Sequence, residues 1–160
     1  MDVFARRIIG FGIQPVYLDG MPVCRMFNHA TAGQRLPKRV STDHDPLFRF
    51  HRRLANLRIL EIEEITSIPC TPVSHPFVER LIGTIRRGYL DRLFFWNARD
   101  LARKLGGFND YYNEHRVHRS LDGITPAQHA GRLPIAPAAL DRTVWQQHCR
   151  ALFQIPVATR

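Results

Sequence analysis

Short segments rich in β-branched residues alternate along this chain with longer helical segments, and this alternation limits the possible folds most strongly. The predicted strands share short length and flanking turn residues, and they cover residues 6–13, 38–42 and 63–68. Apolar spacing and the positions of proline and glycine predict helices over residues 21–32, residues 46–57 and a segment that begins near residue 74. This order of strand, helix, strand, helix, strand and helix predicts an α/β domain with some parallel strand pairing.

The second half of the sequence predicts further helices. Residues 97–116 have helical character, and we expect an interruption at the Gly106–Gly107 pair. Thr125 is followed directly by proline, which is typical of the N-terminal cap of a short helix.

The length of 160 residues suits a single domain that buries its own core. We expect residues 1–130 to form this domain and residues 131–160, which contain several prolines, to form a loosely packed C-terminal tail. The three cysteines stand far apart without a CxxC pair, so neither a zinc ribbon nor a disulfide framework is indicated. No apolar run is long enough for a membrane span, and we expect neither a signal peptide nor a membrane partner.

The charge balance indicates a polyanionic partner. Lysine and arginine number 23 against 14 acidic residues, which gives a net charge of +9. A strong positive charge favours binding to phosphate backbones, because binding releases their counterions. Enzymes that act on small molecules do not need such a charge. An arginine-rich proteome would also give a basic chain, and charge alone leaves that alternative open. Nucleic-acid contact is the favoured expectation.

Two acidic residues stand out against this basic background. Asp43 follows the predicted strand 38–42 at its C-terminal end, the edge at which open α/β sheets bind ligands. Glu79 falls in the first turn of the helix that begins near residue 74, and 35 residues separate the two acids. Such carboxylates can together hold a hard divalent cation. Each acid also has a structural alternative, an Asx-turn for Asp43 and a favourable position against the helix dipole for Glu79.

Three separated motifs occur in the order found in one known family. The segment STDHDPLF with Asp43, and then PVSHPFVERLIGTIRR with Glu79, resemble the second and third acids of the DDE integrases and insertion-sequence transposases. The segment YNEHRVHRSLDGITP, residues 112–126, is similar to the ending of that integrase core. The segment DVFARRIIGFG, residues 2–12, resembles its second and third strands, so the resemblance covers residues 1–130.

The resemblance implies a ribonuclease-H-like fold and phosphoryl transfer at DNA ends, with Mg²⁺ or Mn²⁺ in a two-metal site. It implies that Asp43 and Glu79 are catalytic and metal-binding residues. It also implies DNA as the main partner, with the chain itself or a full-length transposase as a protein partner. The expected location is the bacterial cytoplasm, in association with the nucleoid.

The sequence departs from the family pattern at its N-terminus. The first catalytic acid of the family lies on the first, central strand, whereas Asp2 aligns with the strand after that one. We therefore expect an N-terminally truncated integrase core that lacks its first strand, has an exposed sheet edge and carries extra C-terminal helices. With two of three acids, we expect the chain alone to be inactive. A non-catalytic DNA-binding or transposase-pairing remnant is the alternative.

The helix that carries Glu79 supplies most of the candidate DNA contacts. Positions 79, 83 and 86 share one helical face, which places Arg86 near the expected metal site. The structural alternative for these arginines is a solvated helix face. The predicted DNA-binding residues are Arg80, Arg86, Arg87, Arg116 and His118.

Two other groups have structural interpretations. Arg116 and His118 belong to the third motif. The motif fits a structural role, in which these residues tie a turn onto the core, as well as it fits a DNA contact. Phe94, Phe95 and Trp96 are expected to lie in the core rather than to form a base-stacking platform.

Overall fold

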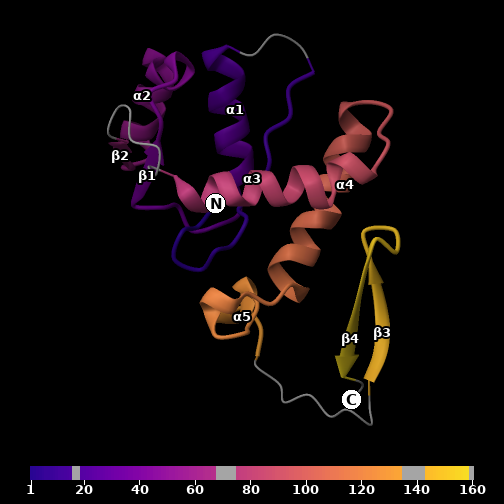
Figure 1. The fold of residues 1–160 in the computed structure, drawn as a ribbon. Helices are drawn as coiled ribbons and strands as arrows, with labels where there is room; N and C mark the ends of the chain where they lie inside the picture. Colours follow the sequence, from indigo (N-terminus) through magenta and orange to yellow (C-terminus); the bar gives the residue numbers. More distant parts are fainter. Residues whose placement is uncertain (16–18, 68–74, 135–142, 159–160) are drawn as a thin grey trace. The chain divides into compact units, whose positions relative to one another are not determined.

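The computed structural model describes residues 1–15, 19–67, 75–134 and 143–158 (Figure 1). The chain divides into two compact units. We call residues 10–79 the inserted unit, and residues 1–9 together with residues 80–160 the split unit. Helix α3, Pro76–Gly88, begins in the inserted unit and continues into the split unit.

The inserted unit is built around two short parallel strands. Its elements are α1 (Gly20–Thr31), β1 (Arg39–Thr42), the 3-10 helix η1 (Pro46–Arg49), α2 (His51–Ile59) and β2 (Glu63–Thr66). The parallel register places Arg39 opposite Glu63 and Thr42 opposite Thr66. The predicted α/β class and the parallel pairing are therefore confirmed, and the predicted strands 38–42 and 63–68 correspond to β1 and β2.

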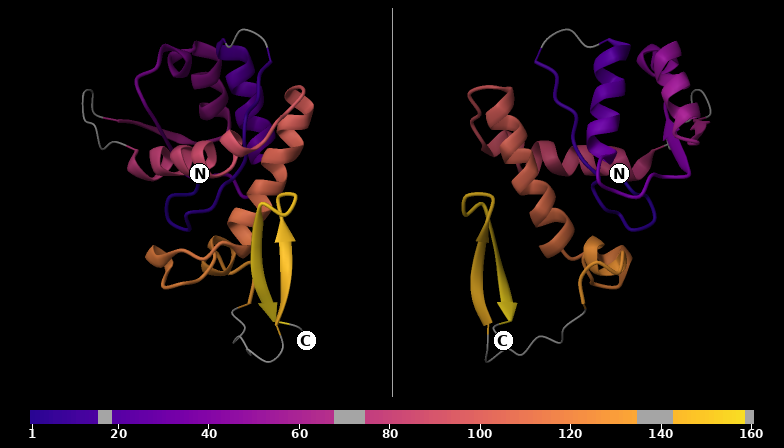
Figure 2. Two further views of the ribbon diagram at one scale, coloured as in Figure 1. Left: turned by 45° about the vertical axis from the view of Figure 1, so that its right-hand side comes forward. Right: turned by 180° about the vertical axis from the view of Figure 1, so that it is seen from behind.

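Helices α1 and α2 lie side by side (Figures 1 and 2). The Asp19 carboxylate caps the N-terminus of α1, in agreement with the predicted helix 21–32. A Cβ atom at Gly20 would come within 2.1 Å of the Phe50 ring, so this close approach requires glycine. The amides of Asn28 and Asn56 exchange hydrogen bonds of 2.7 and 3.2 Å between the two helices.

The split unit is mainly helical and ends in a β-hairpin. After α3 come η2 (Leu90–Arg92), α4 (Ala98–Asp110), the π-helical turn η3 (Tyr111–His115), η4 (Arg119–Leu121), α5 (Pro126–His129), β3 (Thr143–His148) and β4 (Phe153–Ala158). Phe108 is fully buried, and its ring centroid lies 4.9 Å from that of Tyr89 and 5.9 Å from that of Tyr112. These aromatic contacts form the centre of the core. None of the described helices is long and apolar enough to cross a membrane.

Residues 6–13 form no strand, so the strand predicted there was wrong. The backbone N–H of Ile8 donates to Asn113 Oδ1 at 2.9 Å, and Asn113 Nδ2 donates to the Ile8 carbonyl at 2.9 Å. A side-chain amide thus takes the place of the neighbouring strand that the β-branched sequence would otherwise need.

Helix α4 is continuous through Gly106 and Gly107, so the interruption predicted at this pair was also wrong. Leu105 and Phe108 flank the glycines and are buried, and their packing outweighs the low helix propensity of glycine. The predicted cap at Thr125 is confirmed, because Thr125 and Gln128 form a capping box at the start of α5.

Residues 143–158, the longer described part of the tail, are more ordered than the sequence suggests. Strands β3 and β4 form an antiparallel hairpin, coloured yellow in Figure 2. The Phe153 ring stacks on Tyr111 with centroids 4.3 Å apart and an interplanar angle of 3°. The expectation of loose packing was therefore wrong for these residues. The last helix of the described residues is α5, and only the strands β3 and β4 follow it. The extra helices expected at the C-terminus are therefore absent from the described residues after α5.

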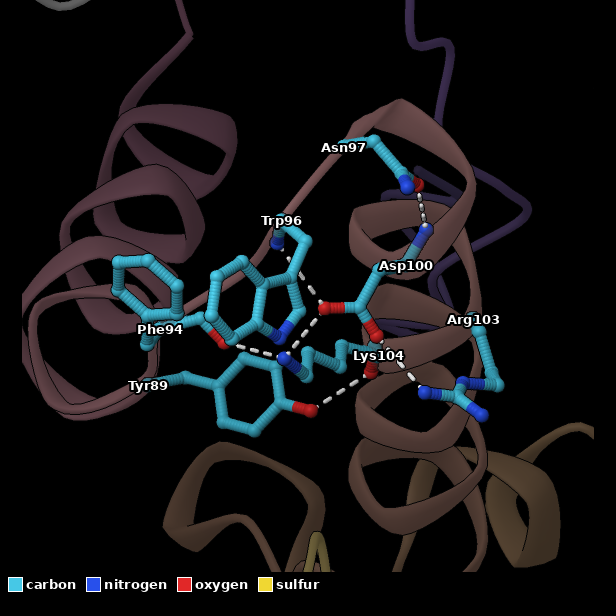
Figure 3. Close-up of polar contacts among 7 residues, drawn as sticks. All are labelled: Tyr89, Phe94, Trp96, Asn97, Asp100, Arg103 and Lys104. Carbon is cyan, nitrogen blue, oxygen red and sulfur yellow. Dashed lines mark hydrogen bonds and ion pairs between the residues drawn. The ribbon is translucent and has the colours of Figure 1, made fainter.

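A buried lysine anchors the segment between α3 and α4 (Figure 3). Lys104 exposes 7% of its side chain, and its Nζ donates to Asp100 Oδ2 at 2.7 Å and to the Phe94 carbonyl. Tyr89 Oη donates to the Lys104 carbonyl at 2.7 Å. Hydrogen bonds from Lys104, and next from Arg103, lower the pKa of Asp100 to about 2.

Two arginine–glutamate pairs in the inserted unit differ in their exposure. Arg39 and Glu63 pair at 2.7 Å with 68% and 61% of their side chains exposed. Arg53 and Glu64 pair at 2.6 Å with 4% and 20% exposed, and Arg53 also donates to the Phe48 carbonyl. Because water screens the first pair but not the second, the two arginines form a matched comparison.

We expect Arg53→Met to lower the free energy of unfolding by about 3 kcal/mol, because it leaves the Glu64 carboxylate partly buried without its cation. Arg39→Met, the control, should cost at most about 1 kcal/mol, since its pair is exposed. Urea denaturation of both variants measures the difference. Equal losses of stability would contradict the assigned roles.

We expect the stability that Asp100 contributes to depend on pH. Its folded-state pKa of about 2 lies below the ordinary 3.8, so the contribution is complete above 3.8 and is lost as the pH falls toward 2. Denaturation of the wild type and Asp100→Asn across this range should give a stability difference that shrinks on acidification. A difference that stays constant with pH would count against the anchor.

Candidate functional site

Asp43 lies directly after β1, at the strand end where the sequence placed it. Its side chain is exposed, and Oδ1 accepts a hydrogen bond from the Asp45 backbone N–H at 3.1 Å. Asp45 in turn accepts from the Leu47 N–H at 2.8 Å and caps η1. The Asx-turn considered for Asp43 is therefore present, and the exposed carboxylate keeps its second oxygen available to a ligand.

A buried polar network holds the strand residue that precedes Asp43. Thr42 is buried, and its Oγ1 donates to Glu64 Oε1 at 2.7 Å. The same glutamate oxygen accepts from Arg53 at 2.6 Å. The end of β1 is thus tied to both β2 and α2, and the backbone from which Asp43 projects is fixed by these bonds.

Glu79 lies in the first turn of α3 with its side chain exposed. Its backbone N–H donates to the His75 carbonyl at 3.0 Å. Its carboxylate forms no salt bridge with a described residue. An acid in the first turn is stabilised by the helix dipole, so the structural alternative for Glu79 is also satisfied. Ser74, the predicted N-cap of this helix, lies outside the described residues.

The carboxylates of Asp43 and Glu79 have the chemistry that a hard divalent cation needs. Both belong to the inserted unit, and both are exposed. Within the described residues, no three His, Cys, Asp or Glu side chains gather into a group that could hold a metal ion. A short distance between the Asp43 and Glu79 carboxylates stays a prediction.

Helix α3 presents an exposed arginine face. Arg80, Arg86 and Arg87 are exposed, and none of them forms a salt bridge with a described residue. The opposite face buries Leu81 and Ile85. This division between apolar and basic faces agrees with the predicted amphipathic helix.

The third motif forms a packed turn. His118 lies edge-on to the Tyr112 ring with centroids 4.8 Å apart, and its backbone pairs with Ile124. The Arg116 guanidinium lies over the same ring, 5.6 Å from its centroid. Burial lowers the pKa of His118, and the neighbouring Arg116 lowers it further. These contacts favour the structural role, and the DNA contacts of Arg116 and His118 stay predictions.

The prediction that Phe94, Phe95 and Trp96 lie in the core was wrong. Their exposed fractions are 70%, 43% and 82%. The three residues fall between η2 and α4, where no helical periodicity directs them inward. Their position ahead of the Asn97 N-cap was the sequence signal that could have identified a loop.

The two buried cations, Arg53 and Lys104, were not predicted from the sequence. The spacing of Asp100 and Lys104 by four residues is typical of a helical ion pair and could have indicated their contact. No comparable local signal marks Arg53, because its partner Glu64 lies on a different element.

Comparison with known proteins gives two sequence matches. Residues 60–126 match the family model of the integrase core domain. This segment contains Glu79 and every predicted DNA-binding residue, whereas Asp43 lies outside it. The chain is also 26% identical over 130 residues to the "Insertion element IS476 uncharacterized 39.2 kDa protein" of Xanthomonas euvesicatoria. That match covers 81% of this chain and 37% of the relative.

Two solved structures share the fold. One is a chain of the simian T-cell lymphotropic virus intasome in complex with PP2A regulatory subunit B56 gamma, with a TM-score of 0.57 and 25% identity. It matches over 81% of this chain and 48% of that chain. The other is the catalytic core domain of BIV integrase, with a TM-score of 0.53 and 22% identity over 72% of this chain and 73% of that chain.

The chain thus spans about half or less of the length of the insertion-element protein and the intasome chain. Its α/β architecture is similar to that of integrase catalytic cores. The family match over residues 60–126 adds the sequence evidence. Together these findings confirm the resemblance of this chain to the integrase core family of integrases and insertion-element transposases.

Proposed function

We propose that this chain is the core region of a DNA integrase or transposase, with residues 1–130 as the catalytic core. The observation that carries the proposal is the integrase core match over residues 60–126, in which Glu79 heads the exposed arginine face of α3. Integration or transposition acts on DNA, and an arginine face suits the phosphate backbone. The solved relative in an intasome supports assembly with itself or with a full-length transposase.

Asp43 and Glu79 would hold Mg²⁺ or Mn²⁺. Asp43 keeps one oxygen outside its Asx-turn, and the exposed Glu79 carboxylate forms no salt bridge with a described residue, so both fit a cation that prefers carboxylate ligands. The bound ions would activate the attacking oxygen and stabilise the leaving oxygen at a DNA phosphodiester. The two carboxylates would bind the ion and orient it, and Arg86, on the same helix as Glu79, would contact a DNA phosphate.

We further propose that the 160-residue chain is inactive alone. Two acids give too few anionic oxygens for a two-metal centre. Within the described residues β1 pairs only with β2, which supports a sheet that lacks the central strand of the family and its acid. A chain of this kind would still bind DNA or pair with a complete transposase.

We expect the Asp43 and Glu79 carboxylates to lie about 4 to 8 Å apart and to share Mn²⁺. Asp43→Asn and Glu79→Gln, singly and together, should therefore remove the same Mn²⁺-binding event. The electron paramagnetic resonance signal of free Mn²⁺ measures this in a titration. The double variant Asp91→Asn/Glu114→Gln removes the same charge from exposed acids of the split unit and should keep the site.

Mn²⁺ binding that survives Asp43→Asn but not Glu79→Gln would contradict the metal assignment, since the two carboxylates would then share no ion. Metal-dependent joining of DNA ends by the 160-residue chain would instead contradict the proposed inactivity. If Asp43→Asn abolished that joining, Asp43 would keep its role as a metal ligand.

We expect the chain to bind duplex DNA with little sequence preference and with an affinity that falls steeply as salt increases. Arg86→Gln should weaken binding to all sequences and reduce the slope of log affinity against log salt by about 1. Arg39→Gln, the control, removes the same charge from an arginine that is already paired with Glu63. Fluorescence anisotropy across a salt series measures both slopes.

An affinity that does not change between low and moderate salt would contradict the proposed DNA contact. Equal slopes for Arg86→Gln and Arg39→Gln would leave DNA binding in place but would remove Arg86 from the contact surface.

A further inference from the structure

Three consecutive aromatic side chains are exposed in the segment between η2 and α4, residues 93–97, which we call the aromatic loop. Phe94 and Trp96 expose 70% and 82% of their surface, and Phe95 exposes 43%. The rings of Phe94 and Trp96 meet edge to face with centroids 4.7 Å apart and planes at 84°. Single exposed apolar residues are ordinary, but adjacent exposed aromatic rings are typical of a binding surface.

The aromatic loop is fixed by polar contacts (Figure 3). The Phe94 carbonyl accepts from the buried Lys104 Nζ, and the Trp96 backbone N–H donates to Asp100 Oδ2 at 3.3 Å. The Asn97 side chain accepts from the Asp100 N–H at 2.9 Å and begins α4. The loop backbone is therefore held on both sides of the rings, which keeps the rings exposed and lowers the entropic cost of binding.

Two exposed arginines lie within three residues of Trp96 or Phe94 in the sequence. Arg92 and Arg99 are exposed, and neither forms a salt bridge with a described residue. The charge of Asp100 is matched by Lys104 and Arg103, at 2.7 Å each. Asp91 is the one exposed carboxylate between residues 89 and 99. The exposed aromatic residues are therefore neighboured along the chain by two exposed arginines that form no salt bridge with a described residue.

This combination suits a nucleic-acid strand better than an apolar protein surface. Aromatic rings provide faces for bases, and adjacent arginines provide contacts for phosphates. Bases within a duplex are already stacked on each other, so only unpaired bases offer a free face. The core of a protein interface is depleted of charged residues, whereas exposed arginines precede and follow these aromatic residues in the sequence.

We propose that the aromatic loop binds unpaired bases of single-stranded DNA, with a base stacked on Trp96 and with Arg92 and Arg99 at the adjacent phosphates. This inference rests on the proposed function, because it names a second form of DNA that the same chain recognises. It assigns the duplex to the arginine face of α3 and the unpaired strand to the aromatic loop.

Tryptophan fluorescence tests the proposal, because a base stacked on an indole quenches its emission. The chain has two tryptophans, Trp96 and Trp145, so Trp145→Phe leaves Trp96 as the single reporter. We expect a short oligothymidylate to quench this emission. Trp96→Ala should lower the affinity for oligothymidylate roughly five- to a hundredfold, and Trp96→Phe should recover part of it.

Trp145→Ala is the matched control, since Trp145 is 70% exposed on β3, away from the aromatic loop in sequence. It should leave the affinity for oligothymidylate unchanged. Thermal unfolding should give the same midpoint for both alanine variants and the wild type, because each ring is largely exposed. If Trp96→Ala weakens oligothymidylate binding while its unfolding midpoint is unchanged, the weaker binding reports the loss of the contact between Trp96 and the base.

The absence of quenching, or equal affinities for Trp96→Ala and Trp145→Ala, would overturn the proposal. So would a loss of self-association in Trp96→Ala, by sedimentation, with unchanged DNA affinity, because the loop would then be a protein contact. Duplex affinity measured in parallel separates the two proposals. Oligothymidylate binding without duplex binding would count against the proposed function and support the aromatic-loop site.

Discussion

The side-chain amide of Asn113 forms hydrogen bonds with both the backbone N–H and the carbonyl of Ile8. This pairing holds the N-terminal residues 1–9 within the split unit. The two residues are 105 positions apart, and both bonds are 2.9 Å long and buried. A buried backbone group without a partner costs about 1–3 kcal/mol, so the pairing keeps residues 1–9 with residues 80–160. Asn109 accepts a further bond from the same amide, which fixes its orientation. The Asn113 amide therefore provides the donor and the acceptor that a neighbouring strand would otherwise offer to Ile8.

The inserted unit depends on a second buried polar contact. Arg53 of α2 and Glu64 of β2 form a largely buried ion pair. Replacement of such a pair by well-packed apolar residues of similar size is often neutral or stabilising. Unlike an apolar pair, this ion pair includes a carboxylate that also accepts a hydrogen bond from Thr42, the residue before Asp43. The bond fixes the position of the C-terminal end of β1. The ion pair thus connects the fold of this unit to its candidate metal ligand.

Local signals explain what the sequence could predict. Helix α5, strand β1 and the start of α3 are specified by neighbouring residues. The positions of Asp43, directly after β1, and of Glu79, in the first turn of α3, were predicted for that reason. Residues 6–13 look like a strand because their β-branched composition is local, whereas the Asn113 amide that replaces a strand is distant in sequence. Trp96 is exposed because polar contacts of the loop backbone outweigh burial of its ring. The separation of the two acids depends on long-range packing and stays a prediction.

The order of charges along α3 explains why one acid heads a row of arginines. Glu79 lies in the first turn, where the helix dipole favours an acid, and Arg86 and Arg87 lie in the last turn, where it favours cations. The helix dipole therefore stabilises the same arrangement that the proposed function would use, an acid at one end for a cation and arginines at the other end for phosphate. The structural and functional explanations of Glu79 do not compete. The segment after α3 is different, because it buries Lys104 and exposes Trp96, an arrangement that burial energies alone would disfavour. A cost of this kind is expected where the exposed ring has a ligand.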